Sequence, residues 1–341
     1  MSEVLVVPNM HKKSFLDFFP VPKFLVLSTV GLSISDRTIR FVEFKNKAGS
    51  DDLELEHSIE YPLPAGAVVD GYIHDKAAVS KVLKEIKSKY SLDYVKATLP
   101  EEKAYLFIVE VDAEPFNSVR DRVAFTVEEN VPVALANSIF DFEIIGDVKG
   151  KSQIKVAVSV LPKKVIEAYL EVLETSGITA VSLEVESQAI ARSIIPIGDE
   201  RPHLIINLGE EKTGLYIVED EVVQFSSTTA YGTRRIDSVY PDLLNLKTEA
   251  RRLFAFWNTR LDKEGVPEKR IEKIMLTGVG AVEEDFVLQF MMGIDIEYSI
   301  ANVWVNSFSL KNYLPEISFQ DSLTFAAAIG VALPDKEPKY V

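Results

Sequence analysis

The chain has 341 residues, 47% of them hydrophobic, four histidines, no cysteine and a formal net charge of −15 at pH 7. This length suits two domains or one domain with an insertion. The acidic balance argues against a nucleic-acid partner, whose phosphates require a basic surface. The lack of cysteine excludes disulfides and thiolate chemistry, and the scattered histidines form no metal-binding motif.

Two properties of the sequence concern membranes and export. No run of 18 apolar residues is present, so we expect no membrane span and no direct membrane insertion. The N-terminus, MSEVLVVPNMHKK, lacks the basic segment and long apolar core of an export signal. We therefore expect a soluble cytoplasmic protein, either free or as a subunit of a larger machine.

The N-terminal region is predicted to form an arm and then the start of a domain. Residues 1–26 hold four phenylalanines and two closely spaced prolines, which favour an extended arm that packs on the body or on a partner. Strand pairs follow at 27–45 and 53–61. Over 77–90 the apolar residues recur at spacings of three and four, which predicts a helix with one buried face.

Segment 98–178 is predicted to be a small α+β unit of its own. Strand, helix, strand, strand and helix follow one another, an order that could bury both helices on one sheet. Gly177 stands just past the second helix, where glycine commonly ends a helix. The expected elements are a strand at 105–111, a helix with Phe116, Val119, Val123 and Val127 on one face, strands at 138–145 and 154–160, and a helix at 163–175.

The second half of the chain repeats the first hairpin. The stretch LIINLGEEKTGLYIV (204–218) has the strand, polar turn and strand of VGLSISDRTIRFVEF (30–44), with a turn one residue longer. Asn207 stands opposite Ser33 in this alignment. A hairpin repeated half a chain apart indicates a duplicated domain with a cleft between its halves.

The other predicted elements lie around this repeat. Small residues in the last of them let another helix approach closely, which suits a hinge between lobes and equally suits plain tight packing. We expect a helix from Ser187 after a strand at 181–186, helices from about Arg234 and Thr248, a strand from 271 that runs into the turn TGVG, and an alanine-rich helix at 321–332.

The order of these pieces points to a nucleotide-binding fold. Two facing hairpin turns offer backbone N–H groups to phosphate oxygens, and a glycine-rich turn lets the backbone approach an adenosine. In this order the chain resembles the actin-like ATPase superfamily, and more closely its PilM branch of type IV pilus assembly. The stretches that carry the resemblance are VGLSISDRTIRFVEF (30–44), LPAGAVVDGYI (63–73), VSLEVESQAIAR (181–192), LIINLG (204–209), KIMLTGVGA (273–281) and AAIG (327–330).

The resemblance covers roughly residues 27–333 and implies the fold class. It implies an α/β protein with a duplicated actin-like (ribonuclease H-like) two-lobed fold and a small inserted α+β subdomain, similar to the SHS2-like subdomain of the cell-division protein FtsA. The implied parts are an arm at 1–26, a first lobe at 27–97 and 179–202, an inserted, partner-binding subdomain at 98–178, a second lobe at 203–333 and a polar tail at 334–341.

The resemblance also implies a nucleotide site, which this sequence alters. In the family each phosphate turn carries an aspartate that holds Mg²⁺, and here Ser33 and Asn207 stand in their place. A hydroxyl and an amide bind Mg²⁺ more weakly than a carboxylate does, so we expect at most weak, magnesium-poor ATP binding, no metal site and very slow or absent hydrolysis. The implied residues are Ser33, Ser35, Asp36 and Thr38 in the first turn, Asn207, Gly209, Glu211 and Thr213 in the second, and Thr277, Gly278 and Gly280 at the adenosine.

Three acids near these turns allow two interpretations each. Asp36 could reach back to a metal ion, but a turn residue that binds backbone N–H groups is favoured. Glu184 and Glu186 precede a small-residue helix where related ATPases place a water-orienting group, whereas acids at a helix start are favoured by the helix dipole in any case. We expect the structural role for all three acids and no catalytic residue.

For a partner, the resemblance implies the short cytoplasmic tail of a PilN-like membrane protein, bound as an extended peptide on segment 98–178. The chain would then be a cytoplasmic adaptor at the periphery of the inner membrane. The alternative for each candidate contact residue is the core of the subdomain. The candidates are Tyr105, Phe107, Phe116, Val123, Val127, Phe140 and Phe142.

Two other functions remain as alternatives. An FtsA-like cytoskeletal protein would share the fold, but that relative ends in an amphipathic membrane helix, and this chain ends in the polar, proline-broken ALPDKEPKYV (332–341). An actin-like ATPase or kinase would need acids that the cleft lacks. The sequence leaves open self-association, ring size, the role of residues 1–26, and the choice among pilus, competence and secretion systems.

Overall fold

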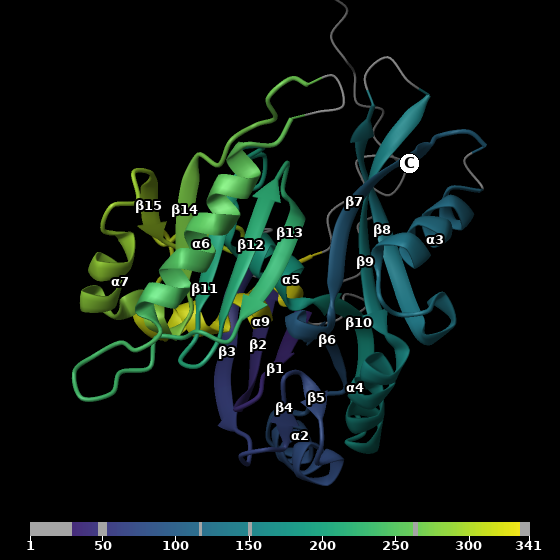
Figure 1. Cartoon of the computed structure of the whole chain (residues 1–341). Helices are drawn as coiled ribbons and strands as arrows, with labels where there is room; N and C mark the ends of the chain where they lie inside the picture. The colour runs from purple at the N-terminus through teal and green to yellow at the C-terminus, as the bar shows by residue number, and fades with distance from the viewer. Residues whose placement is uncertain (1–28, 47–52, 116–117, 149–151, 262–264, 335–341) are drawn as a thin grey trace, which may run out of the picture.

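The computed structural model describes residues 29–46, 53–115, 118–148, 152–261 and 265–334. They form two lobes, each built on a five-stranded sheet, with a three-stranded sheet beside them (Figure 1). The predicted arm and nearly all of the predicted tail lie outside the described residues. None of the described helices has the length and apolar character that a membrane crossing requires.

The first lobe begins with an antiparallel hairpin at the centre of its sheet. Its strands pair from Thr29 with Phe44 to Ile34 with Ile39, which leaves a turn of three residues. Successive side chains of a strand point to opposite faces, and both faces of this hairpin are buried. The sheet order is β10 (Thr179–Val185), β6 (Tyr94–Leu99), β1 (Thr29–Ile34), β2 (Thr38–Asn46) and β3 (Leu53–Pro62).

The second lobe repeats this order, which confirms the duplication. A hairpin is extended by an antiparallel strand on one side and by two parallel strands on the other, as in the first lobe. The hairpin turn, residues 209–212, is one residue longer than its counterpart. The sheet order is β13 (Val222–Thr229), β12 (Thr213–Glu219), β11 (His203–Leu208), β14 (Lys273–Thr277) and β15 (Glu297–Ile300).

One helix, α6 (Leu243–Asn258), replaces the two that were predicted from about Arg234 and Thr248. The prediction of a helix at Arg234 is wrong because Asp237 and Ser238 have φ of 47° and 65°, values that form a tight turn and not a right-handed helix. Helix α7 (Glu284–Met291) packs beside α6 on the outside of this lobe.

The inserted unit is a three-stranded antiparallel sheet covered by one helix. Helix α3 (Val119–Asn130) buries the side chains of Val119, Val123 and Val127 against the sheet, as their spacing predicted. Phe116 lies outside the described residues. The sheet order is β7 (Tyr105–Asp112), β9 (Gln153–Pro162) and β8 (Ser138–Asp147).

The second helix predicted for this segment, α4 (Lys163–Thr175), belongs elsewhere. Its Tyr169 and Leu173 are fully buried in the same core as Leu32 and Phe41 of the first lobe. The expectation that both helices cover one sheet is therefore wrong. A helix that leads into a parallel strand of a sheet must pack on that sheet, and α4 leads into β10. We propose that the inserted unit ends near Pro162 and not at 178.

Other short elements complete the first lobe. Helix α2 (Lys76–Tyr90) begins after Asp75, whose side chain accepts the N–H of Ala78 at 2.9 Å as an N-cap. The ribbon of β4 (Val68–Val69) and β5 (Tyr72–Ile73) precedes α2, and the 3-10 turn η2 (Glu101–Lys103) follows β6.

Helices α5 (Glu186–Ile194) and α9 (Ala326–Ala332) cross where the two lobes meet (Figure 1). A Cβ on Gly330 would lie 1.7 Å from the carbonyl oxygen of Ala189, and one on Gly31 of β1 would lie 2.0 Å from that of Ala328. The close approach expected of the small residues is confirmed. The predicted helix 321–332 is not continuous, because a 3-10 turn at Leu323–Phe325 separates α8 (Phe319–Ser322) from α9.

Candidate functional site

The first hairpin turn satisfies its own polar groups. The hydroxyl of Ser35 accepts the N–H of Thr38 and donates to its carbonyl, both at 3.1 Å. The carboxylate of Asp36 accepts the N–H groups of Asp70 and Gly71, each at 3.1 Å. Asp36 therefore has a structural role, although the N–H groups come from another segment and not from its own turn.

Ser33 and Asn207 provide no charge to the cleft. Ser33 is 7% exposed and lies in β1 opposite Arg40. The side chain of Asn207 hydrogen-bonds the hydroxyl of the buried Tyr216, and its Oδ1 lies 2.6 Å from the place where a Cβ on Gly278 would stand. Both side chains are thus packed into the fold.

The second turn is braced by the segment after β13. The N–H of Gly209 donates to the carbonyl of Lys212 at 2.9 Å, which closes the turn. The carbonyl of Gly209 accepts the N–H of Thr233 at 2.9 Å and its hydroxyl at 3.1 Å. Thr213, also predicted to face phosphate, is fully buried in β12.

The predicted adenosine turn follows β14 and is tightly packed. The hydroxyl of the buried Thr277 donates to the carbonyl of Leu323 at 3.2 Å. Gly278 has a φ of +85°, which side chains rarely adopt, and a Cβ on Gly280 would lie 2.3 Å from Cγ2 of Thr233. Packing alone therefore requires both glycines.

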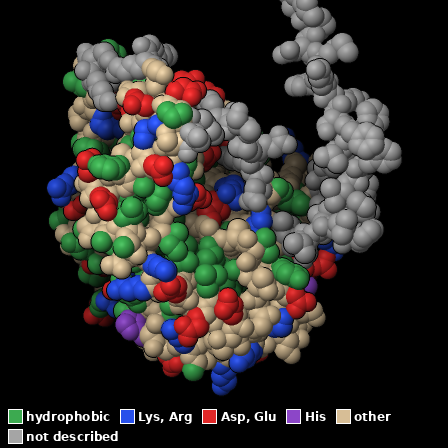
Figure 2. All heavy atoms as spheres, turned by 90° about the vertical axis from the view of Figure 1, so that its right-hand side faces the viewer, with side chains coloured by type: hydrophobic (Ala, Val, Ile, Leu, Met, Phe, Trp, Pro, Cys, Tyr) green, Lys and Arg blue, Asp and Glu red, His purple; other side chains and the backbone are tan. Residues whose placement is uncertain are grey.

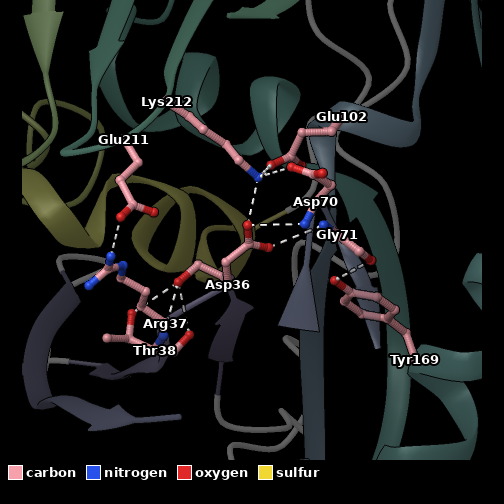
Figure 3. A network of polar contacts seen from close by, with 10 residues as sticks. Asp36, Arg37, Thr38, Asp70, Gly71, Glu102, Tyr169, Glu211 and Lys212 are labelled. Atoms are coloured by element: carbon pink, nitrogen blue, oxygen red, sulfur yellow. Dashed lines mark hydrogen bonds and ion pairs between the residues drawn. The ribbon is translucent and has the colours of Figure 1, made fainter. Parts of the chain in front are cut away.

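Lys212 lies in the second hairpin turn and forms three ion pairs across the cleft, one of them with the first hairpin turn (Figure 3). Its Nζ lies 2.6 Å from Oδ2 of Asp36, 2.7 Å from Oδ1 of Asp70 and 3.1 Å from Oε1 of Glu102. Lys212 belongs to the second lobe, Asp36 and Asp70 to the first, and Glu102 to the turn that leads into the inserted unit. No pattern in the sequence indicated this cluster, because its members lie far apart along the chain.

The charges of this cluster support one another. Partial burial lowers the pKa of Lys212, but its hydrogen bonds to Asp36 and Asp70 and the charge of Glu102 outweigh burial, so the pKa lies above its ordinary value. The hydrogen bond from Lys212 lowers the pKa of Asp70. Lys212 and Asp70 are therefore both charged near neutral pH.

A further ion pair, Arg37 with Glu211, spans the same cleft (Figure 3). The two side chains are 63% and 47% exposed, so water and salt screen the pair and it contributes little to stability. The carboxylate of Glu211, predicted to face phosphate, is occupied by this contact.

The other acids of this region are also engaged. Burial raises the pKa of Glu101, which is 4% exposed and accepts the N–H of Ser187 at 3.0 Å. Burial, with the neighbouring charges of Glu102 and Glu101, raises the pKa of Glu186 to about 8. Glu184 forms an ion pair with Arg192 at 2.6 Å. Glu186 is thus mostly protonated at pH 7 and does not suit the orientation of an attacking water as an anion.

These residues do not fit a complex of ATP with Mg²⁺. The positions expected to hold the metal carry a packed hydroxyl and a packed amide, and the carboxylate of Asp36 in the first turn is bound to Lys212. In the described part of the chain, no three His, Asp or Glu side chains are grouped so that they could hold a metal ion. The cleft is built for internal ion pairs.

A second hollow lies between the inserted unit and the first lobe. It has a volume of about 600 Å³, and its walls come from β8 and β9 on one side and from β10 and α5 on the other. Both β8 and β10 are at the ends of their sheets. In Figure 2, which shows the side of the molecule on the right of Figure 1, hydrophobic side chains gather between charged ones. We call this hollow the inter-unit groove; its apolar lining includes Ile139, Phe140, Phe142, Leu161 and Leu183.

Two of the predicted partner residues, Phe140 and Phe142, line this groove. The guanidinium of Arg120 lies over the ring of Phe140, 4.6 Å from its centroid. Val123 and Val127 are fully buried under α3, so their prediction as groove residues is wrong and the core alternative holds for them. Tyr105 and Phe107 are partly buried against the same core.

The sequence did not reveal the opposite wall of the groove. Leu183, Gln188 and Arg192 belong to the first lobe, and only the packing of the inserted unit brings them beside β8. The amide of Gln188 donates to the hydroxyl of Ser159 in β9 at 3.1 Å, which ties the two walls together at the floor.

Comparisons with known proteins agree on the fold. The family model described as "Type IV pilus assembly protein PilM" matches residues 31–254. A solved structure of a PilM–PilN type IV pilus biogenesis complex is similar over 91% of this chain and 98% of that one, with 20% identity and a TM-score of 0.75. The ethanolamine utilization protein EutJ from Carboxydothermus hydrogenoformans is similar over 91% of both chains, with 12% identity and a TM-score of 0.51.

Proposed function

Because the chain belongs to the PilM family of type IV pilus assembly proteins and has its two-lobed actin-like fold, we propose that it is a cytoplasmic adaptor of an inner-membrane assembly platform. In this role it binds the cytoplasmic tail of a PilN-like membrane protein and holds it at the membrane's inner face. The membrane protein provides the anchorage, and the chain provides the docking surface.

The inter-unit groove carries this proposal. An extended peptide is commonly recognised by a strand edge together with pockets for alternate side chains. Within the described residues, β8 and β10 are each the outermost strand of their sheet, and the groove has an apolar lining between them. Its volume of about 600 Å³ suits several side chains of a tail and exceeds what a single side chain fills.

Polar groups at the groove would fix the register of such a tail. Arg120 stands over Phe140 on the β8 wall, and the Glu184–Arg192 pair stands on the β10 wall. Charged groups at the rim of an apolar groove give specificity more than affinity. The sequence of the tail should therefore matter at its charged positions as well as at its apolar ones.

The experiment is a fluorescence-anisotropy titration with a labelled peptide of the N-terminal cytoplasmic tail of a PilN-like protein from the same organism. Ile139 is 43% exposed on β8 and lines the groove, so Ile139→Arg should keep the fold and weaken binding by at least about tenfold. Leu288→Arg is the matched control, because Leu288 is 62% exposed on α7 of the second lobe. Tail binding that survives Ile139→Arg unchanged would place the partner elsewhere.

For the cleft, we infer that the chain does not hydrolyse ATP. Phosphoryl transfer depends on positioning and on charge neutralisation by a metal, and the residues that face the cleft supply neither a free carboxylate pair nor an open turn. An ATPase or kinase is accordingly the less supported function.

A further inference from the structure

We propose that Lys212 clamps the two lobes together, with its ammonium serving as the resident cation of a three-carboxylate site, so that the lobes close without a bound ligand. The proposal concerns the cleft alone and does not depend on partner binding at the inter-unit groove.

Three carboxylates converge on one point from three separate segments. Asp36 comes from the first hairpin turn, Asp70 from the turn between β4 and β5, and Glu102 from η2, and each has an oxygen within 3.1 Å of Nζ of Lys212. Like charges placed so closely repel one another unless a cation stands between them. The ammonium provides that cation from the opposite lobe.

The backbone holds both sides of the contact in place. Besides its ion pair with Lys212, the carboxylate of Asp36 accepts hydrogen bonds from the N–H groups of Asp70 and Gly71, which hold it in position. The turn that carries Lys212 is closed by a hydrogen bond from the N–H of Gly209 to the carbonyl of Lys212. Since both partners are already ordered, little side-chain entropy is lost when the pairs form.

Most side chains of this cluster are more buried than those of an ordinary surface ion pair. The side chains of Lys212, Asp36 and Glu102 are 27%, 29% and 22% exposed, and that of Asp70 is 61% exposed. Partly buried charges are screened less by salt than exposed ones. Removing Lys212 leaves all three carboxylates without the cation that they share, which costs more than the loss of a surface pair.

One ammonium faces three carboxylates, so its loss has a definite consequence. Without Lys212, the carboxylates of Asp36, Asp70 and Glu102 would lose the one cation that all three contact, and they would face the second lobe with an excess of negative charge. The repulsion acts to draw these carboxylates into water, and the lobes can separate about the crossing of α5 and α9. The raised pKa of Lys212 keeps the clamp charged throughout the physiological pH range.

The test is a distance measurement between the lobes by double electron–electron resonance. The chain has no cysteine, so Ser88→Cys on α2 and Thr248→Cys on α6, both exposed, place one spin label on each lobe. In the otherwise unchanged chain, without nucleotide or metal, we expect one narrow distance distribution. Lys212→Met should shift the distribution to longer distances and broaden it.

Two further variants make the result decisive. Lys273→Met removes a lysine that is 25% exposed and whose ion-pair partner, Glu297, lies in its own lobe, and it should leave the distances unchanged. If Lys212→Met does not fold, Asp70→Asn with Glu102→Gln leaves one ion pair to Lys212 and should still broaden the distribution. The proposal is overturned if Lys212→Met keeps the narrow distribution of the unchanged chain. If Lys212→Met does not fold, the same result in the double variant overturns it.

Discussion

In this cleft, the role of a polar side chain depends on its surroundings, as is seen for Asp36, Ser33 and Asn207. Each was expected near phosphate. In the fold, Asp36 and Asn207 bind groups of the protein itself, and Ser33 is buried in β1. A carboxylate bound by two N–H groups and an ammonium has no free oxygen pair for a metal ion. The polar residues of the cleft therefore bind one another and hold the two lobes together.

Glu186 gives a prediction at this scale. Its pKa is about 8 in the fold and near 4.5 in the unfolded chain, so the folded state binds more protons between these values. The contribution of Glu186 to the free energy of unfolding should therefore fall as the pH rises from about 4.5 to about 8. Glu186→Gln keeps the shape and removes this titration, so its melting temperature should exceed that of the wild type by a margin that grows from pH 5 to pH 8.

Thermal unfolding followed by circular dichroism at several pH values measures that margin. Glu85→Gln, at an exposed position of α2, is the control and should follow the wild type. A Glu186→Gln profile parallel to that of the wild type would show that the carboxyl is ionised in the fold.

Among the elements, the crossing of α5 and α9 joins the lobes through small residues. Seven consecutive residues of α9, from Ala326 to Ala332, are buried, and Gly330 meets the backbone of α5 directly. Interiors are close-packed, and a backbone cannot move aside as the end of a flexible side chain can. This crossing tolerates no added atom.

Gly330→Ala should accordingly destabilise the protein. The added Cβ would lie 1.7 Å from the carbonyl oxygen of Ala189, and such overpacking costs on the order of 1–3 kcal/mol or more. The melting temperature should fall by several degrees. Gly198→Ala is a comparison of the opposite kind, because Gly198 has a φ of +88° and no atom within 4 Å of the added Cβ, so any loss of stability there comes from backbone strain alone. Gly330 lies in a helix and has no left-handed φ, so an unchanged melting temperature of Gly330→Ala would contradict the tight contact with α5.

For the whole molecule, the clamp and the packed turns imply that closure does not require a nucleotide complex. A ligand that binds only the folded state stabilises it by about 2.7 kcal/mol at a concentration a hundred times its Kd. Such a ligand therefore raises the melting temperature. If the metal takes no part, ATP with Mg²⁺ and ATP with EDTA should give the same melting temperature, and phosphate release should stay at the level of buffer.

The comparison variant for this measurement is Ser33→Asp with Asn207→Asp. It restores a carboxylate in each turn, and any metal-dependent stabilisation by ATP should appear only there. A magnesium-dependent rise of the melting temperature in the wild type, with release of phosphate, would contradict the inferred loss of hydrolysis.

The sequence by itself determined the duplicated hairpins, the two-lobed fold, the inserted unit and the close helix contact at Gly330. The hairpins, the α+β segment and the helix contact follow from local patterns: alternation in strands, a repeated turn and runs of small residues. The two-lobed fold with an inserted unit follows from the resemblance to the actin-like ATPase superfamily. It also identified Ser33 and Asn207 as neutral where charge was expected, because residue type is visible without coordinates.

Only the tertiary structure decided where α4 packs, which residues form the walls of the inter-unit groove, and what fills the cleft. Helix α4 has an apolar face that two different sheets could cover, and chain connectivity selects the first lobe. Lys212 meets Asp36, Asp70 and Glu102 across separations of 110 to 176 positions in the chain. No local pattern encodes such a meeting, because it depends on how two separately folded lobes come together.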